Sequence, residues 1–270
     1  MWKAIKYILI YFAFQIIGVL IVVVPGYILD ADKPTLIVLA LGLSNLLFCW
    51  HVVRKGMVRI DKETFTIRSW TVLLLVAIAI FFFLLPEIEL IERLDLPDDL
   101  GDELDEVGGT LLDLISIGFI GPIGEEFLFR GVVLRSLLEW KPIRTVPWVA
   151  VLLSAAFFSL VHMNPAQMPG TFMVGLLFGW IAYRTGSLLP GIVGHVFNNS
   201  LPCIALMLST EESADETIAE MFNSPVLEAL TVAASIFICA FFVRALVHKV
   251  NENYPPCKLD AVSEDNSFHE

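Results

Sequence analysis

Three charged residues in the middle of the chain lie in an apolar segment, where a charged side chain is energetically unfavourable. Glu125, Glu126 and Arg130 lie inside an apolar run over residues 110–138. Each charge near the centre of a membrane helix costs about 2.5–3.5 kcal/mol on insertion scales. Glu126 and Arg130 are four residues apart on one helix face, which predicts an ion pair. Glu125 points away from Arg130 at about 100° per residue, so its carboxylate stays available for chemistry.

Two further apolar runs carry polar candidates at helical spacing. Phe158 and His162 are one turn apart, and His195 and Asn199 share a face with Asn198 beside them. Each group alone is explained equally well by packing, because such side chains often join membrane helices through hydrogen bonds. Three separate helices that each offer a polar group make a stronger case for one shared site.

One carboxylate, two imidazoles and an amide could together hydrolyse an amide bond. A buried carboxylate can take a proton from water, and a histidine can orient that water. A second histidine and an asparagine can donate hydrogen bonds to the oxyanion, worth about 2.7–4 kcal/mol per donor. The same side-chain types could instead bind zinc as a His₂Glu site with an open position for water. Because the chain lacks an HExxH motif, the metal-free and the zinc-dependent mechanism both stay open.

The composition is typical of a membrane protein. Of the 270 residues, 57% are hydrophobic, and the mean hydropathy is +0.76, whereas soluble domains are about 45–50% apolar. We therefore predict an all-α, polytopic integral membrane protein with about eight transmembrane helices. The sequence shows no basic patch with interleaved aromatic residues, so nucleic acid is not an expected partner. The four cysteines form no CxxC pair and indicate neither a disulfide framework nor a metal site.

The apolar runs predict the order of the spans. The expected spans are residues 5–29, 36–53, 70–85, 110–140, 146–163, 171–183, 188–208 and 226–247, and several of them reach the length of about 20 residues that crosses a bilayer. The first is too long for the core of a signal peptide, and Pro86 is expected to end the third. We divide the chain into an N-terminal three-helix segment with an acidic loop (1–108), a catalytic helical core (109–209), an acidic loop with the last helix (210–250) and a disordered acidic tail (251–270).

Charge is distributed unequally between the two predicted sides of the membrane. The 54–68 loop carries five basic residues, whereas the 87–106 loop carries ten acidic ones opposed only by Arg93, and the 211–220 loop is also acidic. The positive-inside rule then places both termini in the cytoplasm. We expect a multi-pass protein of the cell membrane, with the lipid bilayer as its surroundings.

The three motifs, taken in order, resemble the signature motifs of the CPBP intramembrane protease family. This family includes the CAAX prenyl endopeptidases and the Abi, or bacteriocin self-immunity, proteins. The motifs are Glu125-Glu126-x-x-x-Arg130, Phe158-x-x-x-His162 and His195-x-x-x-Asn199. The resemblance implies an intramembrane endopeptidase that acts on a membrane-associated peptide or protein.

The resemblance also implies a role for each matching residue. Glu125 would be the general base, His162 would activate the same water, and His195 with Asn199 would form the oxyanion hole. Supporting roles fall to Glu126, Arg130, Phe158 and Asn198. The cofactor stays unknown, and a bound zinc ion would be held by Glu125, His162 and His195.

Two other functions and one geometrical difficulty stay open. The polar cluster could pack the helices of a non-catalytic scaffold or immunity protein, or line an ion or proton pathway. A helix starting at Thr110 would place Glu125 about 22 Å below the outer surface, out of reach of His162. We therefore expect residues 108–116 to be an interfacial lead-in and the span to start near Ile117, with Glu125 about 12 Å deep.

Overall fold

The computed structural model describes residues 1–94, 96–97, 109–209 and 224–254. Within these ranges the chain is helical and contains no strand. The predicted acidic loop at 211–220 lies outside the described residues, as do half of the 87–106 loop and most of the predicted tail at 251–270.

The helices follow one another along the chain with short connections. The N-terminal part contains α1 (Trp2–Gly18), η1 (Val19–Val23), α2 (Val24–Ile28), α3 (Lys33–Arg54), the short α4 (Lys62–Phe65) and α5 (Thr71–Leu94). The middle contains α7 (Leu111–Asp113), η2 (Leu114–Ile120), α8 (Gly121–Glu126), η3 (Phe127–Leu134) and α9 (Arg135–Leu138). The remainder contains α10 (Pro147–Leu160), α11 (Met168–Thr185), α12 (Leu189–Leu208) and α15 (Pro225–Asn253).

The predicted all-α, multi-pass membrane architecture is confirmed. Five described helices are long and apolar enough to cross a membrane: Trp2–Ile28, Lys33–Arg54, Thr71–Leu94, Leu189–Leu208 and Pro225–Asn253. Large apolar side chains such as Leu20 and Phe237 are exposed on them, as expected of surfaces that face lipid rather than water. The count of eight spans stays a prediction.

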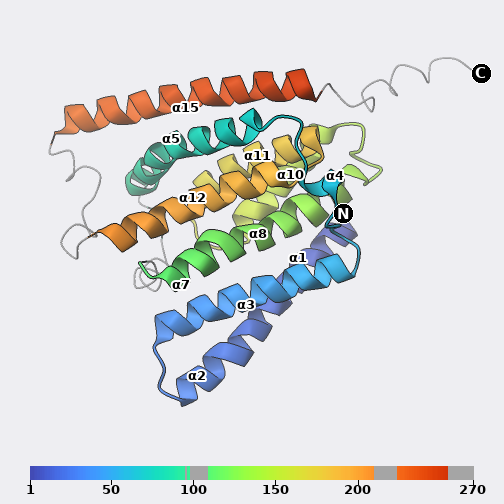
Figure 1. Ribbon diagram of the computed structural model, residues 1–270, viewed down its shortest axis with the longest axis vertical. Helices are drawn as coiled ribbons and strands as arrows, with labels where there is room; N and C mark the ends of the chain where they lie inside the picture. The colour runs from blue at the N-terminus through green and yellow to red at the C-terminus, as the bar shows by residue number, and fades with distance from the viewer. Residues whose placement is uncertain (95, 98–108, 210–223, 255–270) are drawn as a thin grey trace, which may run out of the picture.

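The segments from α7 to α9 form one uninterrupted helix, which we call the central helix (residues 111–138). It lies between α3 and α12, while α15, α5 and α12 lie side by side beyond it (Figure 1). α10 and α11 pack against its second half. Two π-helical stretches, η2 and η3, flank the turn that carries Glu125 and Glu126, and such stretches often occur at functional sites.

Close packing against the central helix depends on a glycine next to the candidate base. A side chain at Gly124 would overlap the side chain of Asn45 on α3. Asn45 in turn accepts a hydrogen bond from Tyr11 on α1, at 3.2 Å between the tyrosine oxygen and Asn45 Oδ1. The two N-terminal helices therefore support the wall of the bundle on which Glu125 stands.

One expectation about a helix boundary is wrong. Pro86 does not end the third span, because α5 continues through it to Leu94; packed neighbours let membrane helices tolerate an interior proline. The central helix begins at Leu111, where Thr110 and Asp113 form a reciprocal capping box. The start of its membrane span near Ile117 stays a prediction.

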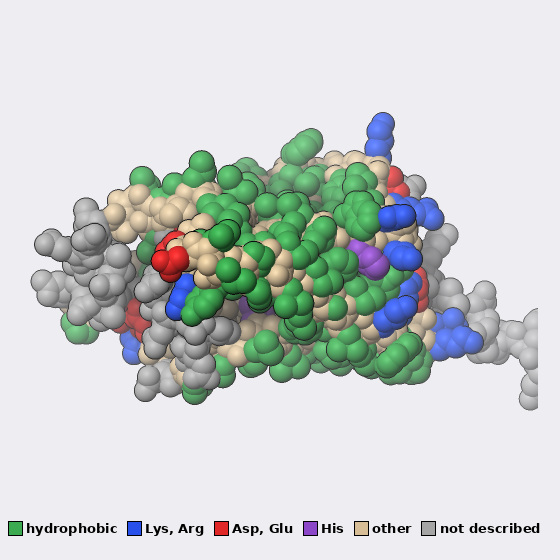
Figure 2. All heavy atoms as spheres, turned by 90° about the horizontal axis from the view of Figure 1, so that it is seen from below, with side chains coloured by type: hydrophobic (Ala, Val, Ile, Leu, Met, Phe, Trp, Pro, Cys, Tyr) green, Lys and Arg blue, Asp and Glu red, His purple; other side chains and the backbone are tan. Residues whose placement is uncertain are grey.

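Charge is also unevenly placed on the folded molecule. In Figure 2 most of the Lys and Arg side chains in view gather at one end, and hydrophobic side chains cover the middle. This arrangement agrees with the basic side predicted from the loops. The acidic segments of the sequence come directly after the C-terminal ends of α5 and α12, at Leu94 and Leu208. Both of these helix ends lie away from the end where the basic side chains gather (Figure 1 and Figure 2).

Candidate active site

A cavity of about 540 Å³ lies among α3, α5, the central helix, α10, α11 and α12. The predicted convergence of the three motifs is confirmed, because the cavity is lined by Glu125, Phe158, His162, His195, Asn198 and Asn199. Its other lining residues are mostly apolar, from Leu41 on α3 to Leu206 on α12. A cavity of this size is within the range of small-molecule sites.

Glu126 and Arg130 form the predicted ion pair in a fully buried setting. Arg130 Nη1 donates to Glu126 Oε1 at 2.6 Å, and the two side chains are 1% and 0% exposed. The guanidinium lies over the rings of Phe158 and Phe178, 4.6 and 5.5 Å from their centroids. Its Nη2 donates to the Gly175 carbonyl at 3.2 Å. The pair therefore ties the central helix to α10 and α11.

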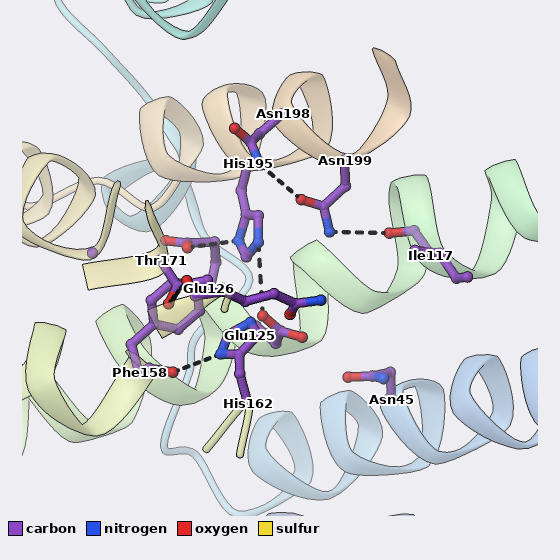
Figure 3. A network of polar contacts seen from close by, with 12 residues as sticks. Asn45, Ile117, Glu125, Glu126, Phe158, His162, Thr171, His195, Asn198 and Asn199 are labelled. Carbon is purple, nitrogen blue, oxygen red and sulfur yellow. Dashed lines mark hydrogen bonds and ion pairs between the residues drawn. The ribbon is translucent and has the colours of Figure 1, made fainter. Parts of the chain in front are cut away.

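Glu126 also orients His195, a link that the sequence spacing does not reveal. His195 Nδ1 is 3.1 Å from Glu126 Oε1, and its Nε2 is 3.7 Å from Glu125 Oε2 (Figure 3). A carboxylate can only accept, so Nδ1 donates and the neutral ring keeps its lone pair on Nε2. Only the doubly protonated ring can donate Nε2–H to an oxyanion.

His162 also has its Nδ1 engaged in a hydrogen bond, which leaves Nε2 available. It lies just past the end of α10 and folds back, with Nδ1 2.8 Å from the Phe158 carbonyl oxygen (Figure 3). Because that carbonyl only accepts, Nδ1 donates and Nε2 carries the lone pair. The Phe158 ring stands beside both imidazoles, 5.0 Å from that of His162 and 5.5 Å from that of His195. Phe158 thus sets the separation of the two histidines.

The two adjacent glutamates have different surroundings, as their spacing from Arg130 predicts. Glu126 is 0% exposed and paired with Arg130, whereas the Glu125 side chain is 20% exposed and lines the cavity. Glu125 Oε2 has no hydrogen-bond partner among the described residues. Because the Glu125 side chain lines the cavity and is not neutralised by Arg130, it is the candidate to accept a proton or a hydrogen bond from a molecule there.

The two asparagines form a short chain beside the cavity. Asn199 Nδ2 lies 3.5 Å from the Ile117 carbonyl, and Asn198 Nδ2 donates to Asn199 Oδ1 at 3.2 Å (Figure 3). The long Ile117 contact is weak, so the Asn199 amide can turn its N–H groups to another acceptor. Asn198 holds the oxygen of Asn199 and so orients that amide.

The candidate zinc ligands do not fit a metal ion in this arrangement. Within the described residues, no group of three His, Cys, Asp or Glu side chains lies in a position to hold one. Glutamate and histidine side chains are suitable zinc ligands, and both histidines donate Nδ1–H to an oxygen as metal-bound histidines do. The side chains of Glu125, His162 and His195 are nevertheless not gathered as ligands.

The structure adds cavity residues that the sequence interpretation missed, namely Glu87, Gln167 and Thr171. Glu87 was assigned to an acidic loop because Pro86 was expected to end the helix. The signal that could have revealed it is the continuing apolar period around it, since Leu84, Ile88 and Ile91 line the same cavity.

Comparison with known proteins agrees with the motif assignment. Residues 107–201 match a protein family described as type II CAAX prenyl endopeptidase Rce1-like. The predicted family resemblance is confirmed. The Rce1-like segment contains all three motifs, while α1, α3, α5 and α15 lie outside it.

A curated relative is similar over nearly the same length. It is an "Uncharacterized 24.3 kDa protein" from Escherichia coli, 30% identical over 93 residues, which cover 32% of this chain and 41% of the relative. The match therefore spans about two fifths of that relative. No solved structure matches the chain.

Proposed function

We propose that this protein is an intramembrane endopeptidase that hydrolyses a peptide bond of a membrane-associated protein or peptide. The observation that carries the proposal is the meeting of Glu125, His162 and His195 at one cavity. Both imidazoles expose Nε2 because Nδ1 is engaged. The Rce1-like match supports a peptidase kind of function.

In the proposed reaction, water attacks the carbonyl carbon of the scissile bond. Glu125 takes one proton from the water, while His162 Nε2 accepts a hydrogen bond from the other O–H and so orients it. The new C–O bond yields a tetrahedral oxyanion. The C–N bond then breaks, and the proton held by Glu125 passes to the departing amine.

The oxyanion is proposed to be held from α12. The Asn199 amide donates one N–H, and doubly protonated His195 donates Nε2–H while its Nδ1–H stays on Glu126. Asn198 orients Asn199, and Phe158 separates the two histidines. Glu126 and Arg130 hold the base, the histidine and three helices in register.

We also propose that both termini are cytoplasmic and that the protein resides in the cell membrane, because basic residues gather at one end of the bundle. Ala31 is exposed in the connection before α3, Lys62 is exposed at the start of α4, and the two residues lie on opposite predicted sides. In a variant without the native cysteines, a thiol reagent applied outside intact cells should label Ala31→Cys and not Lys62→Cys. The opposite labelling would reverse the proposed orientation.

Peptidomics of membranes tests the activity on whatever substrates the membrane contains. Cells that express the wild-type protein should accumulate peptide fragments that are absent with Glu125→Gln at equal protein level. The variant keeps the shape of the side chain but removes its proton acceptor. Identical fragment sets would return the polar cluster to a packing role in a non-catalytic scaffold.

A further inference from the structure

Glu87 is a second carboxylate in the proposed catalytic cavity, and the three motifs do not include it. It stands on α5, directly after Pro86, and lines the cavity together with Glu125 and His162. It also lies outside the Rce1-like segment at residues 107–201. Its position therefore calls for an explanation other than the proposed proton transfer.

No described side chain neutralises the Glu87 carboxylate. Its neighbours on the cavity wall are mostly apolar, including Leu84, Ile88 and Leu206. Arg93 on the same helix is already engaged, because it bonds to Glu89 and donates to Glu228 Oε1 at 3.0 Å. A carboxylate that is shielded from water and left unpaired is unfavourable, so a cationic group that enters the cavity would be attracted to Glu87.

The carboxylate of Glu87 lies against the start of α11. A side chain at Gly170, in the first turn of that helix, would overlap the Glu87 carboxylate. The N-terminal end of a helix carries a partial positive charge of about half an elementary charge. This position helps to hold the carboxylate in place and leaves most of its charge without a partner.

The cavity extends toward the C-terminal ends of α5 and α12. Its lining on α5 reaches Ile91, close to the helix end at Leu94, and its lining on α12 reaches Leu206, close to the end at Leu208. The sequence that follows each end is rich in Asp and Glu, and the whole chain has a formal charge of −12. A negative field at the end of a cleft raises the local concentration of cations.

From this unpaired carboxylate we propose that Glu87 is the subsite for a cationic nitrogen of the substrate, so that the cavity selects peptides with a protonated amine or guanidinium near the scissile bond. This proposal rests on the proposed function, since it assigns a substrate class to the same cavity. The nitrogen can belong to a Lys or Arg side chain or to a free N-terminal amine. Both sources share the chemistry that Glu87 recognises.

Binding of defined peptides tests the subsite without requiring cleavage. The probes are hydrophobic peptides in nanodiscs that differ only in Lys or Gln at one position, each made with a free or an acetylated N-terminus. Affinity is measured with Glu125→Gln protein, in which peptides stay intact. We expect the Lys peptide to bind at least about tenfold more tightly than the Gln peptide, and Glu87→Gln to abolish that preference. A preference that requires a free N-terminus instead identifies the terminal amine as the recognised group.

Glu89→Gln is the matched control, because Glu89 stands two residues away on α5 and bonds to Arg93 outside the cavity. It should leave the peptide preference unchanged. Equal binding of all peptides to protein with Glu87 intact overturns the subsite and needs no further variant. Unchanged preference in Glu87→Gln also overturns it. Failure of the peptidase proposal shows differently, as absence of cleavage by the wild-type protein while the cation preference remains.

Discussion

The spacing Glu-x-x-x-Arg occurs twice in the described helices, and the two copies have different surroundings. On α5, Glu89 bonds to Arg93, whose side chain is 65% exposed. On the central helix, Glu126 bonds to Arg130, whose side chain is 1% exposed. The same local spacing thus gives the same ion pair near the end of the bundle and in its core.

The difference lies in what reaches each pair from other helices. Arg93 is shared with Glu228, so the outer pair fastens α5 to α15. Arg130 lies over the rings of Phe158 and Phe178, and Glu126 is shared with His195. Spacing alone thus predicts an ion pair, whereas neighbours from other helices decide whether that pair supports a site.

Removal of each arginine should have different consequences for the stability of the protein. Arg130→Ala should lower the free energy of unfolding by about 3–5 kcal/mol, because it leaves Glu126 charged and unpaired in a dry core. Arg93→Ala should lower it less, because the Arg93 side chain is 65% exposed and water reaches the outer pair, even though the buried Glu89 and Glu228 lose their partner. Denaturation in detergent micelles measures both. Equal losses of unfolding free energy in the two variants would contradict the difference between the buried pair and the outer pair.

The second prediction sharpens the assignment of the oxyanion donor. Asn199→Ala should lower turnover by roughly 10²–10³-fold, the loss typical of one oxyanion donor. Asn198→Ala should lower it less than about tenfold, because it removes one hydrogen bond that orients Asn199. Rates on one peptide substrate, with folded yield as the control, measure both. The reverse order would make Asn198 the donor.

The third prediction concerns the space around the buried pair. A methyl group at Gly191 would lie 2.5 Å from Glu126 Oε2, so Gly191→Ala should destabilise the fold by about 1–3 kcal/mol and disturb the contact with His195. Gly179→Ala is the matched control, because its methyl group would meet Val151 at 3.3 Å. Thermal unfolding of the two variants gives the comparison. A control that loses as much stability as Gly191→Ala would show that the Glu126 contact is not decisive.

The sequence predicts those features that depend on local spacing. The ion pair of Glu126 with Arg130 and the shared face of His195 and Asn199 follow from a four-residue period, and the membrane class follows from long apolar runs. The convergence of the three motifs from separate helices was expected, because each motif places polar residues in an apolar helix and because the motifs resemble those of a known family. The shared cavity confirms this convergence.

Features that depend on tertiary contacts could not be predicted. The bond between Glu126 and His195 joins residues 69 positions apart, and no helical period encodes it. Pro86 was expected to end a helix by its own chemistry, but α5 continues through it in contact with α12 and α15. That error placed Glu87 in a loop, although it lines the cavity.

The central claim is that Glu125 is the proton acceptor in peptide hydrolysis. The most direct test compares the turnover of purified wild-type and Glu125→Gln protein, both stripped of metal, on the same membrane peptide. We expect cleavage by the wild-type protein and a rate lower by roughly 10²–10⁴-fold in the variant, the range of a positioned base, with equal thermal unfolding. Equal rates in the two proteins would contradict it.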